Sequence, residues 1–307
     1  MKLPAAYTDL PAPSRGVLLM FASAMCYALT FASVRQLSES FSVYQLVLFR
    51  AAIGTTVMLP WLYRSGFRTL QTNRWKLYGV RAVAVYTGNL CWFYALAHIA
   101  LADATALSFL MPLFTIVILA FWMRERLTGP RLVALFLGLA GAVVIIRPGF
   151  AEVGIAAIGM IYTAAAYGAA TAFTRVLTKT EDSNVVVFYL FAINFPIALG
   201  PGLLHWTMPG WGDVGWIVGF AVLSLYAQIF MTRSLALAEA AVVMPSYYLQ
   251  LPFVALFGYV LFGQVPEIWL IPGALLIIGG SYYALRSESR KRRQETAGQD
   301  TAGQEAA

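Results

Sequence analysis

The stretch CYALTFASVR at residues 26–35 has a degenerate second copy, AYGAATAFTR, at residues 166–175. The tyrosine near the start and the arginine at the end of the first copy align with their counterparts at an offset of 140 residues. Pro112 and Pro252 align at the same offset, far along the chain from the first pair. A nearly constant offset over such a span indicates an internal repeat, in which two halves of the chain share one fold.

The composition indicates a membrane protein. Of the 307 residues, 60% are hydrophobic and 11% are charged, whereas a soluble domain carries about 25% charged residues. The charges lie between long apolar runs, which is typical of transmembrane helices, and these runs are too continuous for the alternating strands of a β-barrel. We therefore expect an all-α integral membrane protein.

Ten apolar segments are each close to the ~20 residues that a helix needs to cross the hydrocarbon core of a bilayer. The connections between them are short, which favours one compact bundle. The segments are residues 16–34, 43–63, 77–97, 104–123, 131–147, 154–174, 185–204, 214–233, 240–263 and 267–285. We expect each of them to form a transmembrane helix.

The basic residues predict the orientation of these helices, because cytoplasmic connections carry an excess of Lys and Arg. If the N-terminus is cytoplasmic, the connections outside the cell hold only Arg35 and Arg147 of the 21 Lys and Arg residues. Arg50 and Arg81 lie within helices, and all the others fall on the cytoplasmic side. We therefore expect both termini to be cytoplasmic.

Each copy of the repeat holds five expected spans, at residues 16–147 and 154–285. Because five is an odd number, the second copy enters the membrane in the opposite direction to the first. Inverted repeats of this kind are typical of transporters that open one central site to either side of the membrane in turn. Residues 1–15 are expected to form a cytoplasmic N-terminus, and residues 286–307 a basic, disordered cytoplasmic tail.

Two further motifs carry a resemblance to a known family. The first half contains ATALSFLMPLFTIVILAFWMRERL at residues 104–127, and the second contains MPSYYLQLPFVALFGYVLFGQ at residues 244–264. With the repeat of two five-helix halves, these motifs resemble the drug/metabolite transporter superfamily, in the branch with two EamA-type domains. The sequence departs from the family pattern at Gln264, where many members have Glu, so it has no acid for a proton-linked role at that position.

The resemblance implies a transporter of small organic metabolites in the bacterial inner membrane, working by alternating access. An amino-acid-like or an aromatic or heterocyclic compound is the expected substrate, and family frequency favours export. The alternative is an uptake permease for a nucleoside- or vitamin-like compound, of the S-adenosylmethionine or riboflavin type. A remote alternative is an integral membrane enzyme that acts on lipid, which would need a cluster of His, Asp or Glu at one membrane face.

The residues themselves offer little for catalysis, and no enzyme activity, cofactor or metal is expected. The chain has two histidines and no paired carboxylates at helical spacing within a span. A transport site needs only aromatic and hydrogen-bonding side chains around a cavity near the middle of the membrane. The candidate substrate-binding residues of this kind, together with Arg50, are Tyr86, Asn89, Trp92, Ser108, Tyr226, Gln228, Tyr247 and Gln250.

Pro112 and Pro252 are candidate hinges, because a proline inside a helix frees a backbone carbonyl and produces a kink. A plain kink without a gating role is the alternative for both.

Arg50 is the one candidate with a full charge, and it lies about seven residues, or ~10 Å, into its helix. A charge at that depth is costly towards lipid, so the side chain is expected to face the bundle. Two interpretations remain open. Arg50 either braces the bundle by bonding freed carbonyls or Asp103, or it presents positive charge to an anionic group of the substrate.

The expected partners are a small-molecule substrate and the lipid bilayer, and nucleic acid is not expected because the basic residues follow the membrane topology. Ala134, Gly138 and Ala142 lie four residues apart on one helix and allow close helix approach. Packing within the bundle is one interpretation of this stripe, and a homodimer interface is the other.

Overall fold

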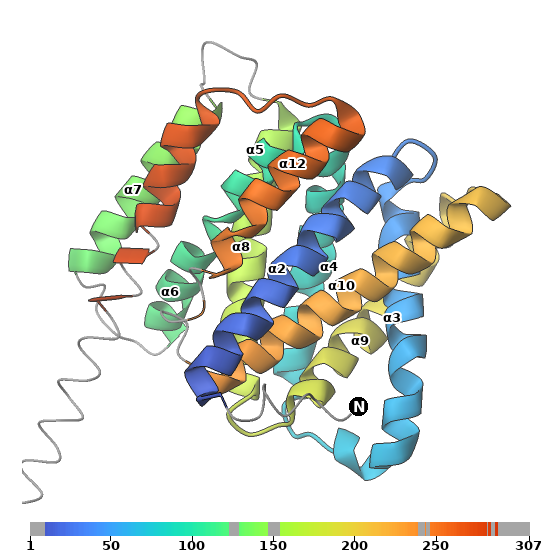
Figure 1. Ribbon diagram of the computed structural model, residues 1–307. Helices are drawn as coiled ribbons and strands as arrows, with labels where there is room; N and C mark the ends of the chain where they lie inside the picture. The colour runs from blue at the N-terminus through green and yellow to red at the C-terminus, as the bar shows by residue number, and fades with distance from the viewer. Residues whose placement is uncertain are drawn as a thin grey trace, which may run out of the picture.

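The computed structural model describes residues 10–122, 129–146, 154–238, 243, 246–280, 282–283 and 286–287. The helices among them are α2 (Ala12–Leu37), α3 (Val43–Ser65), η1 (Phe67–Leu70), α4 (Trp75–His98), α5 (Leu101–Ser108), α6 (Met111–Trp122), α7 (Gly129–Ile146), α8 (Ile155–Leu177), α9 (Ser183–Leu204), α10 (Trp211–Leu237) and α12 (Gln250–Phe262). Residues 270–280 add a further apolar helix, Leu270–Gly280. The described part of the chain is therefore an α-helical bundle (Figure 1).

Five helices in the described ranges are long and apolar enough to cross a membrane by themselves: α2, α3, α8, α9 and α10. Several of the other predicted spans appear as shorter apolar helices, such as Phe136–Ile145 and Leu270–Gly280. Large hydrophobic side chains point outward from the bundle, including Phe136 and Ile155, as expected for a surface that faces lipid. The helix lengths alone do not establish ten spans, which stay a prediction from the sequence.

Equivalent helices of the two halves begin with equivalent caps. The Ser42 side chain accepts a hydrogen bond from the Gln45 backbone N–H at the start of α3. The Asp182 side chain accepts one from the Asn184 N–H at the start of α9. These short polar residues satisfy backbone donors that have no partner within the helix. Because Ser42 and Asp182 are 140 residues apart, the repeat extends to the helix boundaries.

The segments 104–123 and 240–263, predicted as continuous helices, are each broken in the structure. α5 ends at Ser108 and α6 begins at Met111, with a turn at Phe109 and Leu110. In the second half, a turn at Leu249 separates helical residues 246–248 from α12. Each break precedes a proline, because a proline lacks the N–H that would continue the helix and disfavours helical geometry in the residue before it.

Pro112 and Pro252 consequently lie in the first turn of a new helix, where a proline is tolerated, rather than at a kink in mid-helix. The two breaks are 140 residues apart, like the other features of the repeat. The structure thus has a discontinuous helix in each half.

The most extensive helix contacts join one half to the other. α2 packs along α10, α4 along α8, and α3 along α9. In terms of the repeat, the first helix of each half packs on the third helix of the other, and the two second helices pack on each other. This reciprocal pattern is that of two inverted halves related by a pseudo-two-fold axis. Figure 1 shows α2 and α10 lying side by side along their length.

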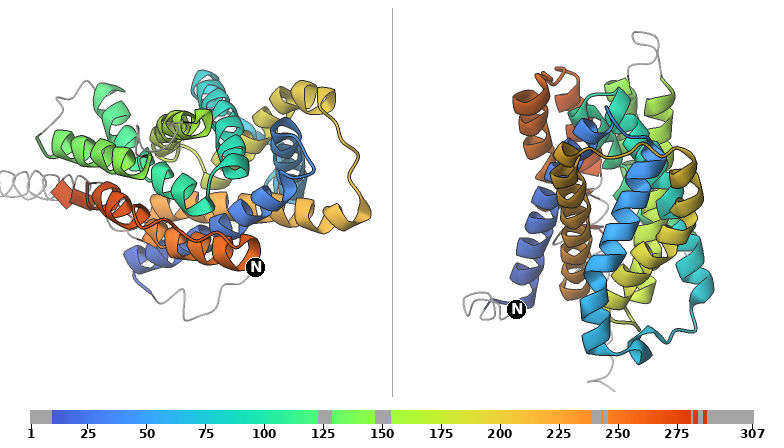
Figure 2. Two further views of the ribbon diagram at one scale, coloured as in Figure 1. Left: turned by 90° about the horizontal axis from the view of Figure 1, so that it is seen from above. Right: turned by 90° about the vertical axis from the view of Figure 1, so that its right-hand side faces the viewer.

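The fifth helix of each half also meets its counterpart. α7 and the helix at residues 270–280 lie side by side at one edge of the bundle (Figures 1 and 2). A Cβ at Gly141 would lie 2.6 Å from the Gly273 carbonyl oxygen, so the two backbones are in direct contact. Gly138 packs against Leu113 of α6, and Ala142 is buried. These small residues therefore serve packing within the bundle, while the Ala134 side chain lies outside the described residues.

α6 and α8 cross closely at Gly168. A Cβ there would lie 2.7 Å from Phe114 Cβ and 3.0 Å from the backbone at Met111 and Thr115. Thr115 Oγ1 also donates a hydrogen bond of 3.1 Å to the Gly168 carbonyl. The crossing thus depends on a residue without a side chain.

We predict that Gly168→Ala lowers the stability of the detergent-solubilised protein by about 1–3 kcal/mol, the usual effect of overpacking. The exposed helical Gly215 is the matched control, since a Cβ there meets nothing within 4 Å. Gly215→Ala is expected to leave stability unchanged or to raise it by up to ~1 kcal/mol. Thermal unfolding of both variants measures the difference, and equal melting temperatures would contradict the packing described.

Candidate functional site

A cavity lies between the two halves of the bundle. Its volume is approximately 90 Å³ in this conformation, so it has room for a small molecule. Helices α2, α3, α4, α5 and α6 contribute lining residues from the first half, and α8, α9, α10 and Tyr247 contribute them from the second. A site that both halves build in this way changes shape whenever the halves move relative to each other.

Two tyrosine hydroxyls cross from one half to the other at the cavity wall. Tyr27 of α2 donates to Gln228 Oε1 of α10 at 2.9 Å, and Tyr167 of α8 donates to Asn89 Oδ1 of α4 at 2.7 Å. Tyr27 and Tyr167 are the tyrosines of the two repeat copies. Each half therefore reaches from its first helix to an amide on the third helix of the other half, and the pair of bonds follows the pseudo-symmetry.

Arg50 projects from α3 to the cavity and is 9% exposed. Its Nε donates a hydrogen bond to the Ser224 hydroxyl of α10. Its guanidinium carbon lies 5.2 Å from the centre of the Phe191 ring of α9, which is a cation–π distance. Both partners belong to the second half. The sequence offered Asp103 as one possible partner for a bracing Arg50. Asp103 is absent from the described contacts of Arg50 and from the cavity lining.

Arg81 is a second arginine in the cavity wall, and it is only 2% exposed. Its Nη1 donates to the Val186 carbonyl of α9 at 2.9 Å. Its Nε is buried and has no hydrogen-bond partner among the described residues. Arg50 and Arg81 lie near the N-terminal ends of consecutive helices that run in opposite directions, so they approach the cavity from opposite ends of the bundle.

The discontinuous helices contribute the cavity residues Ser108 and Tyr247. Ser108 is the last residue of α5, and Tyr247 precedes the turn that leads into α12. The Tyr247 hydroxyl has Ser108 and Gln250 as polar neighbours. Phe109, in the first of the two turns, packs edge-on against Tyr248 at 5.0 Å between ring centres. The two helix breaks therefore meet beside the cavity.

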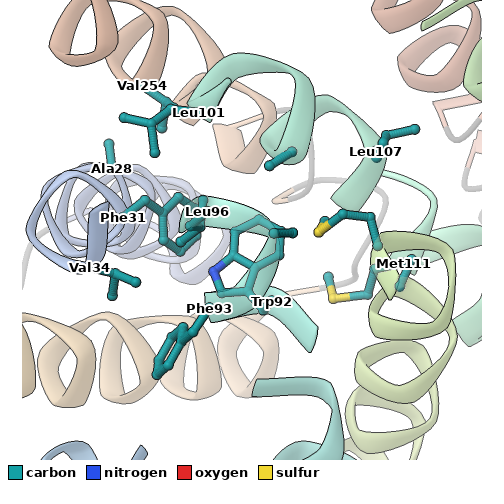
Figure 3. Close-up of a cluster of buried hydrophobic side chains, with 14 of the residues drawn as sticks. Ala28, Phe31, Val34, Trp92, Phe93, Leu96, Leu101, Leu107, Met111 and Val254 are labelled. Atoms are coloured by element: carbon teal, nitrogen blue, oxygen red, sulfur yellow. The ribbon is translucent and has the colours of Figure 1, made fainter. Parts of the chain in front are cut away.

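Aromatic rings form the apolar part of the wall. The Trp92 ring lies 4.7 Å from that of Phe31 in an edge-to-face arrangement and 6.4 Å from that of Tyr167. Figure 3 shows Trp92 between Phe31 of α2 and Met111 of α6, and all three residues line the cavity. Ring faces beside polar groups suit a ligand that has both an apolar and a polar part.

The cavity contains hydrogen-bonding groups and cations but no acid, since none of its lining residues in the described ranges is Asp or Glu. The described part of the chain also has no cluster of three or more His, Cys, Asp or Glu that could hold a metal ion. The arrangement can bind and orient a small polar molecule.

The structure brings together most of the residues that the sequence singled out as candidates for substrate binding. Those that line the cavity are Arg50, Asn89, Trp92, Ser108, Gln228 and Tyr247. Gln250 is fully buried beside them, at the start of α12, without lining the cavity. These residues, brought together in one place, form the candidate site.

Tyr86 and Tyr226 lie elsewhere. Tyr86 is half-buried and does not line the cavity, and Tyr226 is 45% exposed on the outer surface of α10. Residues two apart on a helix point in widely different directions, so Tyr226 and Gln228 of one helix cannot both face the cavity. Once Gln228 is placed inside by Tyr27, Tyr226 is on the outside.

Arg81, Tyr27, Tyr167 and Ser224 are cavity residues that the sequence did not single out as binding candidates. A signal existed for the tyrosines, since they are the aligned pair that reveals the repeat. A second signal existed for Arg81. It is four residues before Val85 and eight before Asn89, so all three cavity residues share one face of α4. No pattern marks Ser224, which only the crossing of α3 and α10 brings to Arg50.

Gln264 has a structural partner. Its Oε1 accepts a hydrogen bond of 3.1 Å from the Leu101 backbone N–H, at the start of α5. A neutral amide thus satisfies a helix N-terminus of the first half at the position where many family members carry Glu. Glu125, the acid at the corresponding place in the first half, lies outside the described residues.

Comparison with known proteins agrees with this architecture. The model of the EamA-like transporter family matches the chain twice, at residues 14–147 and 154–286. The chain belongs to the EamA-like transporter family. It is a multi-pass membrane protein of the transporter type, and a solved crystal structure with 19% identity shares the fold, with a TM-score of 0.64 over 90% of this chain and 98% of the other.

Several members of the EamA-like family with known names are similar to this chain over most of their length. The riboflavin transporter of Brucella anthropi is 30% identical over 80% of this chain and 88% of its own. The pseudopaline exporter CntI of Pseudomonas aeruginosa is 30% identical over 86% of this chain and 93% of its own. The S-adenosylmethionine uptake transporter of Rickettsia prowazekii is 22% identical over 80% of this chain and 84% of its own. Transporters of small organic metabolites, for both uptake and export, are thus among the relatives.

We predict that Tyr167→Phe destabilises the protein by about 1–2 kcal/mol, because it leaves Asn89 Oδ1 without its buried donor. Tyr162→Phe is the matched control on the same helix. Its hydroxyl is 2.7 Å from Thr87 Oγ1 on the outer surface. Thr87 Oγ1 keeps its own hydrogen bond of 2.9 Å to the Val83 carbonyl, so a change below ~0.5 kcal/mol is expected. Denaturation curves of the two variants measure the free energy of unfolding. Equal decreases in the two variants would contradict a larger contribution of the Tyr167–Asn89 bond.

Proposed function

We propose that this chain carries a small organic metabolite across the bacterial inner membrane by alternating access between its two inverted halves. The observation that supports this most is the cavity, which both halves line and which the Tyr27–Gln228 and Tyr167–Asn89 bonds span. A rocking motion of one half against the other would open such a cavity to one side of the membrane and close it to the other.

The proposed topology has ten spans, one five-helix repeat at residues 16–147 and the other at 154–285, with both termini in the cytoplasm. Reciprocal contacts of α2 with α10 and α4 with α8 support the inverted arrangement of the halves. The distribution of Lys and Arg supports the orientation.

Hydrogen bonds join the two halves at both ends of the bundle. At the end where α3 begins, Gln45 Nε2 donates to the Thr207 carbonyl at 2.7 Å, and the Thr207 N–H donates back to Gln45 Oε1 at 3.0 Å. At the other end, Glu181 accepts hydrogen bonds from the hydroxyls of Thr72 and Tyr78. In the proposed cycle these two sets break in turn, since opening one end requires the halves to separate there.

The proposed substrate is an amino-acid-like, aromatic or heterocyclic compound. Trp92, Phe31 and the tyrosines offer ring faces to such a molecule, and Asn89, Gln228 and Ser108 offer hydrogen bonds. Export is the proposed direction, on the frequency of exporters in the family. Uptake of a vitamin- or nucleoside-like compound is the second candidate, which the similarity to riboflavin and S-adenosylmethionine transporters favours.

Alternating access is testable without knowing the substrate, by placing one cysteine in the cavity. Ser108→Cys, in a background of Cys26→Ala and Cys91→Ala, is expected to react with a membrane-impermeant thiol reagent added to either side of oriented vesicles. Ser40→Cys and Ser65→Cys are the controls. Both positions are exposed, at opposite ends of α3 and its preceding turn, so each is expected to react from one side only.

Counterflow of labelled compounds in the same vesicles separates a carrier from a pore. Riboflavin, S-adenosylmethionine and a set of labelled amino acids are suitable first probes, and a carrier shows saturable exchange of at least one compound class. Labelling of Ser108→Cys from one side alone under all conditions would contradict alternating access. Flux that never saturates would indicate a channel instead.

A further inference from the structure

The cavity holds two arginines and, among its described lining residues, no acid. A buried guanidinium is costly unless it is paired, and the cost is greater within a membrane. Structural arginines in such places usually have a carboxylate partner or a full set of hydrogen bonds. Arg50 and Arg81 have neither in the described structure, so their positive charge is balanced by something that the described residues do not supply.

The contacts of Arg50 leave part of its guanidinium for a ligand. Nε is held by Ser224, and one face lies over Phe191. A guanidinium carries further N–H donors on its two terminal nitrogens, and no described residue accepts a hydrogen bond from those of Arg50. The side chain is anchored at Nε and presents its remaining donors to the cavity, which is the geometry for bidentate binding of an oxyanion.

Arg81 adds a second, more deeply buried charge to the same cavity. One hydrogen bond, to the Val186 carbonyl, orients it, and its Nε has no partner in the described part of the chain. The other polar lining groups near the two arginines are neutral hydroxyls and amides, such as those of Ser224 and Asn89. The electrostatic potential in the cavity is therefore positive, which raises the local concentration of anions.

We propose that the ligand of this cavity is an organic anion, with an oxyanion group bound to Arg50 and stabilised by Arg81, and an apolar or aromatic body against Trp92 and Phe31. This inference rests on the proposed function, because it names the substrate class of the same site. Carboxylate and phosphate groups share the required chemistry. A neutral or cationic metabolite would leave both charges unbalanced.

Three compounds of nearly one shape test the charge preference: benzoate, the neutral benzamide and the cationic benzamidinium. Binding to the purified full-length protein is measured by quenching of tryptophan fluorescence, with phenyl phosphate as the phosphate arm. Benzoate or phenyl phosphate is expected to bind at least about tenfold more tightly than benzamide, and benzamidinium most weakly. The stronger of the two anions identifies the oxyanion class.

Variants show whether the arginines are responsible. Arg50→Gln is expected to reduce the benzoate-to-benzamide ratio to below about threefold. Arg64→Gln, at an exposed position near the end of the same helix, is the matched control and leaves the ratio unchanged. Ser224→Ala removes the anchor but not the charge and is expected to retain most of the preference. Arg81→Gln removes the second charge and is expected to lower the benzoate-to-benzamide ratio as well. If Arg81→Gln does not fold, Arg81→Lys keeps the charge and is expected to keep the ratio.

Equal or tighter binding of benzamide or benzamidinium would overturn the proposal, as would an unchanged ratio in Arg50→Gln. Absence of binding by both anions up to ~10 mM would also overturn it, since small ligands of this size bind measurably at a matched site. Failure of the proposed function gives a different result. Charge-selective binding without counterflow and without two-sided labelling would support the anion site and contradict the carrier function. Saturable counterflow without charge selectivity would support the carrier function and contradict the anion site.

Discussion

Inside a bilayer a polar group has no water to bond, so it must find a partner within the protein or in a cavity. This constraint explains where the polar side chains of the chain lie. Tyr27 and Tyr167 satisfy Gln228 and Asn89 across the interface between the halves. The outer surface of the bundle, by contrast, carries large apolar side chains. Polar contacts thus lie at the interface that rearranges in the proposed transport cycle.

The interface follows the inverted repeat in its helix pairing but not in its charge. α2 with α10 and α4 with α8 are symmetric pairs, and so are the two Tyr–amide bonds. Both arginines of the cavity come from the first half, and both are oriented by groups of the second half, Ser224 and the Val186 carbonyl. A symmetric scaffold therefore surrounds an asymmetric site.

In the proposed cycle the halves separate at one end of the bundle at a time, and the side-chain hydrogen bonds between the halves at each end are few. Gln45 and Thr207 at one end, and Glu181 with Thr72 and Tyr78 at the other, are small sets of hydrogen bonds. Hydrogen bonds of this kind contribute about 1 kcal/mol each between neutral groups and about 1.5–3 kcal/mol each to a charged group such as the Glu181 carboxylate. The close contact of Gly168 of α8 with α6 also joins the two halves, and it does so by packing instead of by hydrogen bonds.

The sequence by itself determined the class and the repeat. Apolar runs of membrane length between basic connections specify helices, and the offset that aligns Tyr27 with Tyr167 and Pro112 with Pro252 specifies two equivalent halves. These features are local or periodic, so they are legible along the chain. The same reasoning named Asn89, Trp92, Ser108 and Gln228 as binding candidates, because polar groups in mid-membrane are often functional, although they also bond between helices.

Only the tertiary structure decided which of these groups share a cavity. The hydrogen bond from Tyr27 places Gln228 on the inner face of α10, so Tyr226, two residues earlier, faces outward. Which face of a helix is the inner one depends on the helices packed against it. The sequence marked both prolines as kinks within continuous helices, and only the structure shows that the helices end in turns before them, at Phe109–Leu110 and at Leu249. Arg50 meets Ser224, and Arg81 joins it from the opposite end, because helices more than 100 residues apart in sequence cross there. Contacts of that range carry no signal in a single sequence.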